Sequence, residues 1–291
     1  MFGHVRGRKV GVIQINDSLY GGAVAYNTIA KIQRLICERD GTIVLKINYS
    51  GRVGLPSMFM IGVMPIYGKT QGKNVRIIVS HKMYVMLSRI NVIDYYLYQN
   101  RKKDVEIDYG LLLKKPAFRD IKNSKDIIQF INELSMEVPL KLSDDMSEIL
   151  TSRIGEIFLN ALEHAGATNV IGGKYYRNSK NRYCFTCYDD GQGIINNVQE
   201  FNQREKGLIL SDKEALKWAM EPGHSTSNSK ISRGIGLSML KEFAMENGFT
   251  VRVCSGTGYY ELNGQTKRER FMGLKEYFRG TIFEVNILAS C

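Results

Sequence analysis

Residues 182–194 read RYCFTCYDDGQGI, an apolar run that leads directly into two aspartates and two glycines. The run from Arg182 to Tyr188 predicts a strand, and Asp189 follows at its end. Gly191 and Gly193 come next at alternate positions, where glycine lets the backbone approach a flat ligand without a Cβ clash. A carboxylate at Asp189 can accept a hydrogen bond from an exocyclic amine such as that of adenine. The competing interpretation is an ordinary Asp-Gly turn between a strand and a loop.

A second signal precedes this stretch on a predicted helix that runs from a Ser143 cap through Ala165. Glu156 and Asn160 lie four residues apart, so they share one face of that helix. An amide oxygen is a hard ligand that suits Mg²⁺, and a carboxylate can deprotonate water as a general base. The alternative is a surface pair that only stabilises its own helix.

A third signal, RGIGL at residues 233–237, opens a helix predicted to end at Asn247. Backbone N–H groups at a helix start suit phosphate oxygens, and Gly234 and Gly236 lie at this start. The polar loop over residues 222–233 is long enough to fold over a ligand as a lid. A plain joint between loop and helix is the alternative.

A fourth signal is RGTIF at residues 279–283. With all four in this order, residues 125–291 resemble the ATPase domain shared by gyrase, histidine kinases and the mismatch-repair protein MutL, the GHKL superfamily. The resemblance implies an α+β sandwich of the Bergerat type, in which a mixed sheet packs against helices with ATP between them. It implies Mg²⁺ on Asn160, adenine read by Asp189 with Thr281 close by, and Glu156 as the general base. The residues expected to contact ATP are Asn160, Asp189, Gly191, Gly193, Ile194, Gly234, Ile235, Gly236, Leu237 and Thr281.

Two departures argue against an autophosphorylating histidine kinase. Glu163 stands where histidine kinases of this superfamily often carry a lysine that contacts phosphate. His81 lacks the adjacent acidic residue expected beside a phosphoacceptor histidine.

The chain before residue 125 alternates strand and helix signals, which favours an α/β layer with strands at least partly parallel. We expect an α/β domain over residues 1–100, a linker over 101–124 and the ATP-binding domain over 125–291. Residues 42–98 weakly resemble a STAS domain, the fold of anti-sigma-factor antagonists. The expected strands are Lys9–Ile15, Thr42–Tyr49 and Val75–Ser80, and the expected helices are Ala23–Arg39, Ser57–Tyr67 capped by Ser57, and Met83–Tyr98.

The later part of the chain carries further element signals. Ser211 is expected to open a helix that reaches Glu221. The other expected elements are a helix over Lys125–Met136 and strands over Asn169–Tyr176, Thr250–Ser255, Gly258–Leu262 and Thr281–Leu288.

The composition, with 44% hydrophobic and 24% charged residues, is that of an ordinary globular protein. No apolar run approaches the roughly 20 residues that span a bilayer, so we expect a cytoplasmic protein without membrane insertion. Cys184 and Cys187 have redox spacing, but in a strand positions three apart point to opposite faces, which favours core thiols. The net charge of +11 favours acidic partners, including nucleic acid. Basic runs such as Lys267–Arg270 are expected in loops, where a solvated surface is the alternative.

These signals predict an intracellular regulatory protein that binds and hydrolyses Mg-ATP, with a lid that controls a protein partner. A nucleotide-dependent homodimer is a further expectation. Two alternatives stay open at this point. One is a serine/threonine protein kinase of the anti-sigma-factor type, and the other is a non-hydrolytic ATP switch on a nucleic-acid-binding protein.

Overall fold

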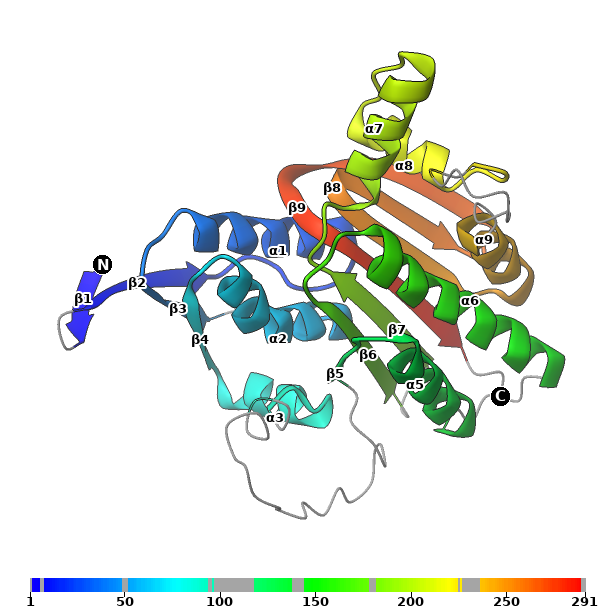
Figure 1. Ribbon diagram of the computed structural model, residues 1–291. Coiled ribbons are helices and arrows are strands. Elements are labelled where there is room, and N and C mark those ends of the chain that lie inside the picture. The colour runs from blue at the N-terminus through cyan, green and yellow to red at the C-terminus, as the bar shows by residue number, and fades with distance from the viewer. Residues whose placement is uncertain are drawn as a thin grey trace. The chain divides into compact units, whose positions relative to one another are not determined.

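The computed structural model describes residues 2–5, 8–48, 52–93, 96, 118–137, 144–177, 182–224, 226 and 236–288. The chain divides into two compact units (Figure 1). The first unit is Met1–Arg119 together with Lys275–Phe278, and the second is Asp120–Leu274 together with Arg279–Cys291. Each unit combines helices with a β-sheet, so the predicted mixture of helix and strand is confirmed.

The first unit contains a sheet of order β1-β2-β3-β4. Strands β2, β3 and β4 are mutually parallel, as expected, and Ile13 lies opposite Leu45, which lies opposite Ile77. Successive parallel strands in sequential order place their right-handed crossover helices on one face, and α1 and α2 pack together. The bounds are β1 Phe2–Val5, β2 Arg8–Ile15, α1 Gly22–Cys37, β3 Thr42–Ile47, α2 Leu55–Thr70, β4 Asn74–Val79 and α3 His81–Arg89.

The observed start of helix α2 in the first unit differs from the predicted start. Ser57 does not cap α2, because the helix already begins at Leu55 after Gly54, and Ser57 is buried within it. Pro56 explains the earlier start, since its fixed φ suits the first helical turn. Ser80, predicted to end a strand, instead caps α3 by accepting a hydrogen bond from the Met83 N–H. Helix α3 ends at Arg89, residues 92, 93 and 96 are helical again, and the predicted end at Tyr98 lies outside the described residues. Strand β1 was not predicted.

The second sheet has the order β5-β6-β7-β9-β8. Strand β7 is antiparallel to both neighbours, and this register sets Asp189 opposite Val170 on one side and Thr281 on the other. The two strands predicted over residues 250–262 are one continuous strand, because Gly256 takes a positive φ of 54° that glycine tolerates within it. The bounds are β5 Phe118–Asp120, β6 Val170–Arg177, β7 Arg182–Asp189, β8 Thr250–Asn263 and β9 Arg268–Leu288.

Strand β9 starts at Arg268, thirteen positions before the predicted Thr281. Only Lys267 of the basic run Lys267–Arg270 lies in a turn, so the expected loop is wrong for the other three residues. Glu269 within this stretch pairs with Lys241 at 2.9 Å. Charged residues alternate here with partly buried ones, which is the pattern of a strand with one solvated face.

Helices α5, α6 and α9 of the second unit lie side by side, with α6 between the other two (Figure 1). Ser211 caps α8 as predicted, in a reciprocal capping box with Glu214. Ser143, the predicted cap of α6, lies outside the described residues. Helix α7 was not predicted. The bounds are α5 Ser124–Glu137, α6 Asp144–His164, α7 Ile194–Lys206, α8 Asp212–Ala219 and α9 Gly236–Asn247.

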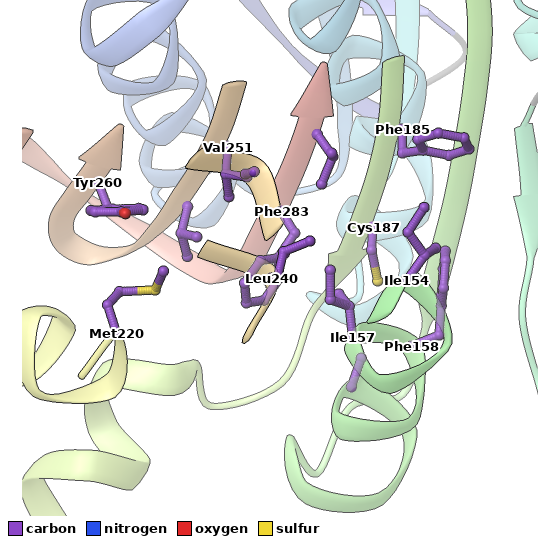
Figure 2. Close-up of a cluster of buried hydrophobic side chains, with 14 of the residues drawn as sticks. Ile154, Ile157, Phe158, Phe185, Cys187, Met220, Leu240, Val251, Tyr260 and Phe283 are labelled. Carbon is purple, nitrogen blue, oxygen red and sulfur yellow. The ribbon is translucent and has the colours of Figure 1, made fainter. Parts of the chain in front are cut away.

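The core of the second unit forms where these helices meet the sheet (Figure 2). Side chains of Ile157 and Phe158 on α6 and Leu240 on α9 point toward Cys187 on β7 and Phe283 on β9. This packing fixes α6 and α9 against the strands that carry Asp189 and Thr281. Burial of each large apolar side chain contributes about 1.5–3 kcal/mol.

The cysteines of β7 behave as predicted. Cys187 belongs to the helix-side core, whereas the Cys184 thiol lies 3.2 Å from the Tyr175 hydroxyl. Both thiols are buried and free, so the prediction of core thiols is confirmed. No helix among the described residues has the length and apolar character needed to cross a bilayer.

Candidate functional site

Asp189 ends β7 with its carboxyl group almost fully buried, 4% exposed. One carboxyl oxygen accepts a hydrogen bond from the Gly191 N–H at 3.0 Å. Burial raises the pKa of Asp189 to about 7, against the lowering effect of the hydrogen bonds from the Gly191 and Thr281 backbones. The neighbouring charge of Asp190 raises this pKa further. The site therefore holds a carboxyl group that changes charge near neutral pH.

The two glycines after the aspartates occupy positions where no side chain fits. A Cβ on Gly191 would lie 2.1 Å from the Ala165 carbonyl oxygen. Gly193 has a φ of 87°, and a Cβ there would lie 2.5 Å from the Ser255 hydroxyl. The Gln192 N–H also donates to the Ala165 carbonyl at 3.0 Å, which ties the loop to the end of α6. The glycines thus bring this loop into contact with the helix that carries Glu156 and Asn160.

Thr281 joins the loop from a different strand. Its hydroxyl accepts a hydrogen bond from the Ile194 N–H at 3.1 Å and lies 3.4 Å from the Ser255 hydroxyl. Ser255 in turn donates to the Gly280 carbonyl at 2.9 Å. Gly280 has a φ of 83°, and a Cβ on it would lie 1.9 Å from the Asp189 carbonyl oxygen. The structure therefore brings Asp189, Ile194 and Thr281 into one hydrogen-bonded group.

The adjacent Asp190 has a different role. One carboxylate oxygen accepts from the backbone N–H groups of Thr168 and Asn169, each at 2.8 Å. The other accepts from the Asn169 side-chain amide at 2.6 Å. Asp190 thus ties the end of β7 to the segment before β6, whereas the local turn of the competing interpretation is made by Asp189, which accepts from the Gly191 N–H two residues further on. Asp189 is left as the carboxyl group at the strand end.

Glu156 and Asn160 lie on α6, as predicted. The Arg153 guanidinium donates to one Glu156 carboxylate oxygen at 3.0 Å. The second oxygen is buried and has no hydrogen-bond partner among the described residues. Asn160 is exposed. Two oxygen groups of different kinds, a carboxylate oxygen without a donor and an exposed amide, thus lie one helical turn apart on α6.

The predicted phosphate motif is only partly described. Gly234 and Ile235 lie outside the described residues, as does most of the predicted lid. Helix α9 begins at Gly236, and Leu237 packs against the core. Before the lid, the His224 ring stacks on Trp218 with centroids 4.5 Å apart and an interplanar angle of 11°.

Ser255 and Asp190 are site residues that the sequence analysis missed. Ser255 had no signal, because it lies in the middle of β8, far along the chain from the residues that it bonds. The role of Asp190 had no local signal either, because the backbone groups that it binds, at Thr168 and Asn169, precede it by more than twenty positions.

The described residues include no cluster of three or more His, Cys, Asp or Glu side chains able to hold a metal. The chain matches no protein-family model and shows no significant similarity to a curated protein.

Proposed function

We propose that the second unit binds Mg-ATP in a site of the GHKL type and hydrolyses it, so that the protein acts as a nucleotide-controlled regulator. The observation that carries this proposal is the hydrogen-bonded group of Asp189, Gly191, Ile194 and Thr281. Two separate sequence motifs meet in it, as the resemblance implies for an adenine site.

The residues present fit an adenine ring. Gly191, Gly193 and Gly280 let the backbone pack closely against Ala165, Ser255 and Asp189, where a Cβ would clash, and this packing holds the loop beside the Asp189 carboxyl. This carboxyl is held by the Gly191 N–H and can accept a hydrogen bond from an exocyclic amine. The ionised carboxylate could make no such bond to the carbonyl that guanine carries at that position, so we expect adenine to be preferred in the ionised form.

The residues on α6 fit a magnesium ion and a reacting water. Asn160 offers an exposed amide oxygen, and Mg²⁺ usually takes few protein ligands in addition to phosphate oxygens and water. Mg-ATP, when bound, supplies a γ-phosphoryl group activated for attack by water. Glu156 would accept a proton from that water through its unpartnered oxygen, while Arg153 holds the other oxygen in place.

Variants on α6 test the proposal. Binding of Mg-ATP is measured by isothermal titration calorimetry, and phosphate release by a coupled assay. We expect Asn160→Ala to abolish binding, and Glu156→Gln to keep binding and lose hydrolysis. The control Glu148→Gln changes an exposed carboxylate on the same helix and should leave both unchanged.

The result that refutes ATP binding is a wild-type protein without measurable affinity, or Asn160→Ala with wild-type affinity. Unchanged turnover in Glu156→Gln would remove the general-base role. Label from [γ-³²P]ATP on a protein hydroxyl would point to the kinase alternative instead of hydrolysis by water.

We further propose that the regulated partner is acidic and binds the first unit. Residues 1–119 contain nineteen Lys and Arg against seven Asp and Glu, a formal charge of +12, whereas residues 120–291 carry −1. Charge of one sign concentrated in one unit attracts oppositely charged partners over long range. We expect affinity for an acidic protein or nucleic acid to fall steeply with added salt. Salt-independent binding would contradict this assignment.

A further inference from the structure

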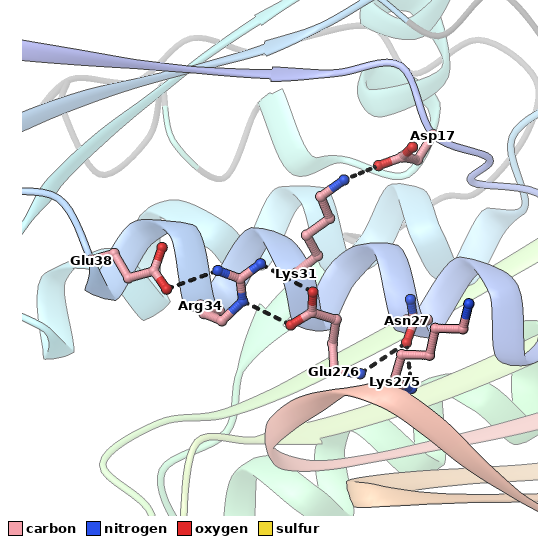
Figure 3. Close-up of polar contacts among 7 residues, drawn as sticks. All are labelled: Asp17, Asn27, Lys31, Arg34, Glu38, Lys275 and Glu276. Carbon is pink, nitrogen blue, oxygen red and sulfur yellow. Dashed lines mark hydrogen bonds and ion pairs between the residues drawn. The ribbon is translucent and has the colours of Figure 1, made fainter.

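The middle of β9, residues 275–278, belongs to the first unit and is held there by side chains of α1 (Figure 3). The Asn27 side-chain oxygen accepts two backbone hydrogen bonds, from the Lys275 N–H at 2.8 Å and from the Glu276 N–H at 3.0 Å. One asparagine thus binds two successive peptide groups of the strand, which defines the position of the backbone itself.

Arg34, two turns further along α1, binds the same stretch through its side chain. Its Nε donates to one Glu276 carboxylate oxygen at 2.8 Å and its Nη2 to the other at 3.1 Å. Its Nη1 donates to Glu38 at 2.8 Å, so the guanidinium is held on two sides (Figure 3). The hydrogen bonds from Arg34 lower the pKa of Glu276. Two parallel N–H donors to one carboxylate fix direction as well as distance.

An aromatic contact completes this attachment. Phe278 is fully buried and meets the Tyr26 ring edge-on, with centroids 6.1 Å apart and an interplanar angle of 82°. We call Asn27, Arg34 and Tyr26, with the residues 275–278 that they hold, the α1 clamp.

The clamp lies directly before the site on the same strand. Glu276 and Thr281 are five residues apart, about 17 Å along an extended strand. Gly280, between them, lies so close to β7 that a Cβ on it would be 1.9 Å from the Asp189 carbonyl oxygen. A shift of residues 275–278 along the strand would therefore move Gly280 and Thr281, and would lengthen the bond from the Ile194 N–H to the Thr281 hydroxyl.

We propose that Asn27 and Arg34 are positioning residues for the site at Thr281, and that a ligand or partner that displaces α1 changes the affinity of this site. In naming ATP as the ligand of that site, the inference rests on the proposed function. The positioning of Thr281 by Asn27 and Arg34 does not depend on that function, because it concerns the backbone of β9.

Hydrogen exchange measured by mass spectrometry tests the positioning without nucleotide. In Asn27→Ala we expect the amides of residues 280–282 and 194 to exchange about five-fold faster, the factor that corresponds to one net hydrogen bond. Asn27→Asp keeps the accepting oxygen and should restore wild-type exchange. A merely local role would accelerate only residues 275 and 276.

Lys31→Gln is the matched control. Lys31 lies on the same helix at a similar exposure to Arg34 and pairs with Asp17 at 2.7 Å, and it acts on Glu276 through its charge, without the hydrogen bonds that Arg34 makes (Figure 3). Arg34→Gln should accelerate exchange at residues 280–282, whereas Lys31→Gln should not. Adding Glu276→Gln to Arg34→Gln should produce little further change if the two side chains act through each other.

Affinity for Mg-ATP gives the second readout. We expect Asn27→Ala and Arg34→Gln to weaken binding about five-fold with unchanged turnover at saturation, because neither touches the reacting groups. Wild-type exchange at residues 280–282 in both variants overturns the positioning role. Failure of the wild-type protein to bind Mg-ATP would refute the proposed function instead, and the exchange results would still decide the role of the clamp.

Discussion

Replacement of Asp189 by asparagine should remove a large part of the pH dependence of folding stability. Asp189 is buried at the end of β7, and its pKa is raised from 3.8 to about 7 chiefly by burial. Asparagine has nearly the same shape and no charge in this range, and its oxygen can still accept from the Gly191 N–H. The variant therefore isolates the cost of ionising this one carboxyl group.

The sign and size of the effect follow from the two pKa values. The folded state holds the Asp189 proton more tightly than the unfolded state does. The stability that this carboxyl group contributes is therefore fully present below pH 4 and is lost as pH rises through about 7. Between pH 5 and pH 8 this carboxyl group should reduce the free energy of unfolding by about 2–3 kcal/mol. Other titrating groups contribute equally to wild type and variant.

Urea unfolding followed by circular dichroism at pH 5, 6, 7 and 8 measures the effect. The quantity of interest is the difference in unfolding free energy between Asp189→Asn and wild type, which should grow in favour of the variant by about 2–3 kcal/mol over this range. Carbon-13 NMR of the Asp189 carboxyl should give a titration midpoint near 7. A difference that stays constant with pH, or a midpoint near 4, would refute the burial argument.

Three further predictions concern other parts of the second unit. Gly280→Ala should destabilise the protein by about 3 kcal/mol or more in urea unfolding, because its Cβ would lie 1.9 Å from a backbone oxygen at a φ of 83°. Ser211→Ala should cost about 1 kcal/mol, since it removes the side-chain half of the capping box of α8, whereas Ser211→Thr should retain most of it. Burial raises the pKa of each core thiol, so iodoacetamide and mass spectrometry should find no label without denaturant on Cys184, Cys187 and Cys254. Rapid labelling of these thiols in the native protein would show that the sheet opens readily.

The elements that could be predicted are those with strong local signals. The apolar run of β7 and the capping serine of α8 needed no information from elsewhere in the chain. Helix α7 could not be recognised, because its sequence is mostly polar and only three of its residues are buried. The start of β9, within the basic run Lys267–Arg270, was predicted to be a loop for a similar reason, since its charges alternate on a solvated face.

The candidate site likewise has features that the sequence predicts and features that it does not. The sequence alone identified Asp189, its glycines and Thr281 as separate signals, and the order of the motifs suggested one ligand. It could not say which of two adjacent aspartates is buried. That depends on Thr168 and Asn169, whose backbone binds Asp190.

Local elements, the residue types at each motif and the concentration of positive charge in residues 1–119 depend on neighbouring positions or on composition, so they can be predicted from the amino-acid sequence. The burial of Asp189 with a pKa near 7 and the hydrogen bond from the Ile194 N–H to the Thr281 hydroxyl arise only in the folded chain. The same is true of the attachment of residues 275–278 to α1. Burial and hydrogen bonding at these points are produced by groups up to 249 positions apart in the chain, whose meeting no local pattern encodes.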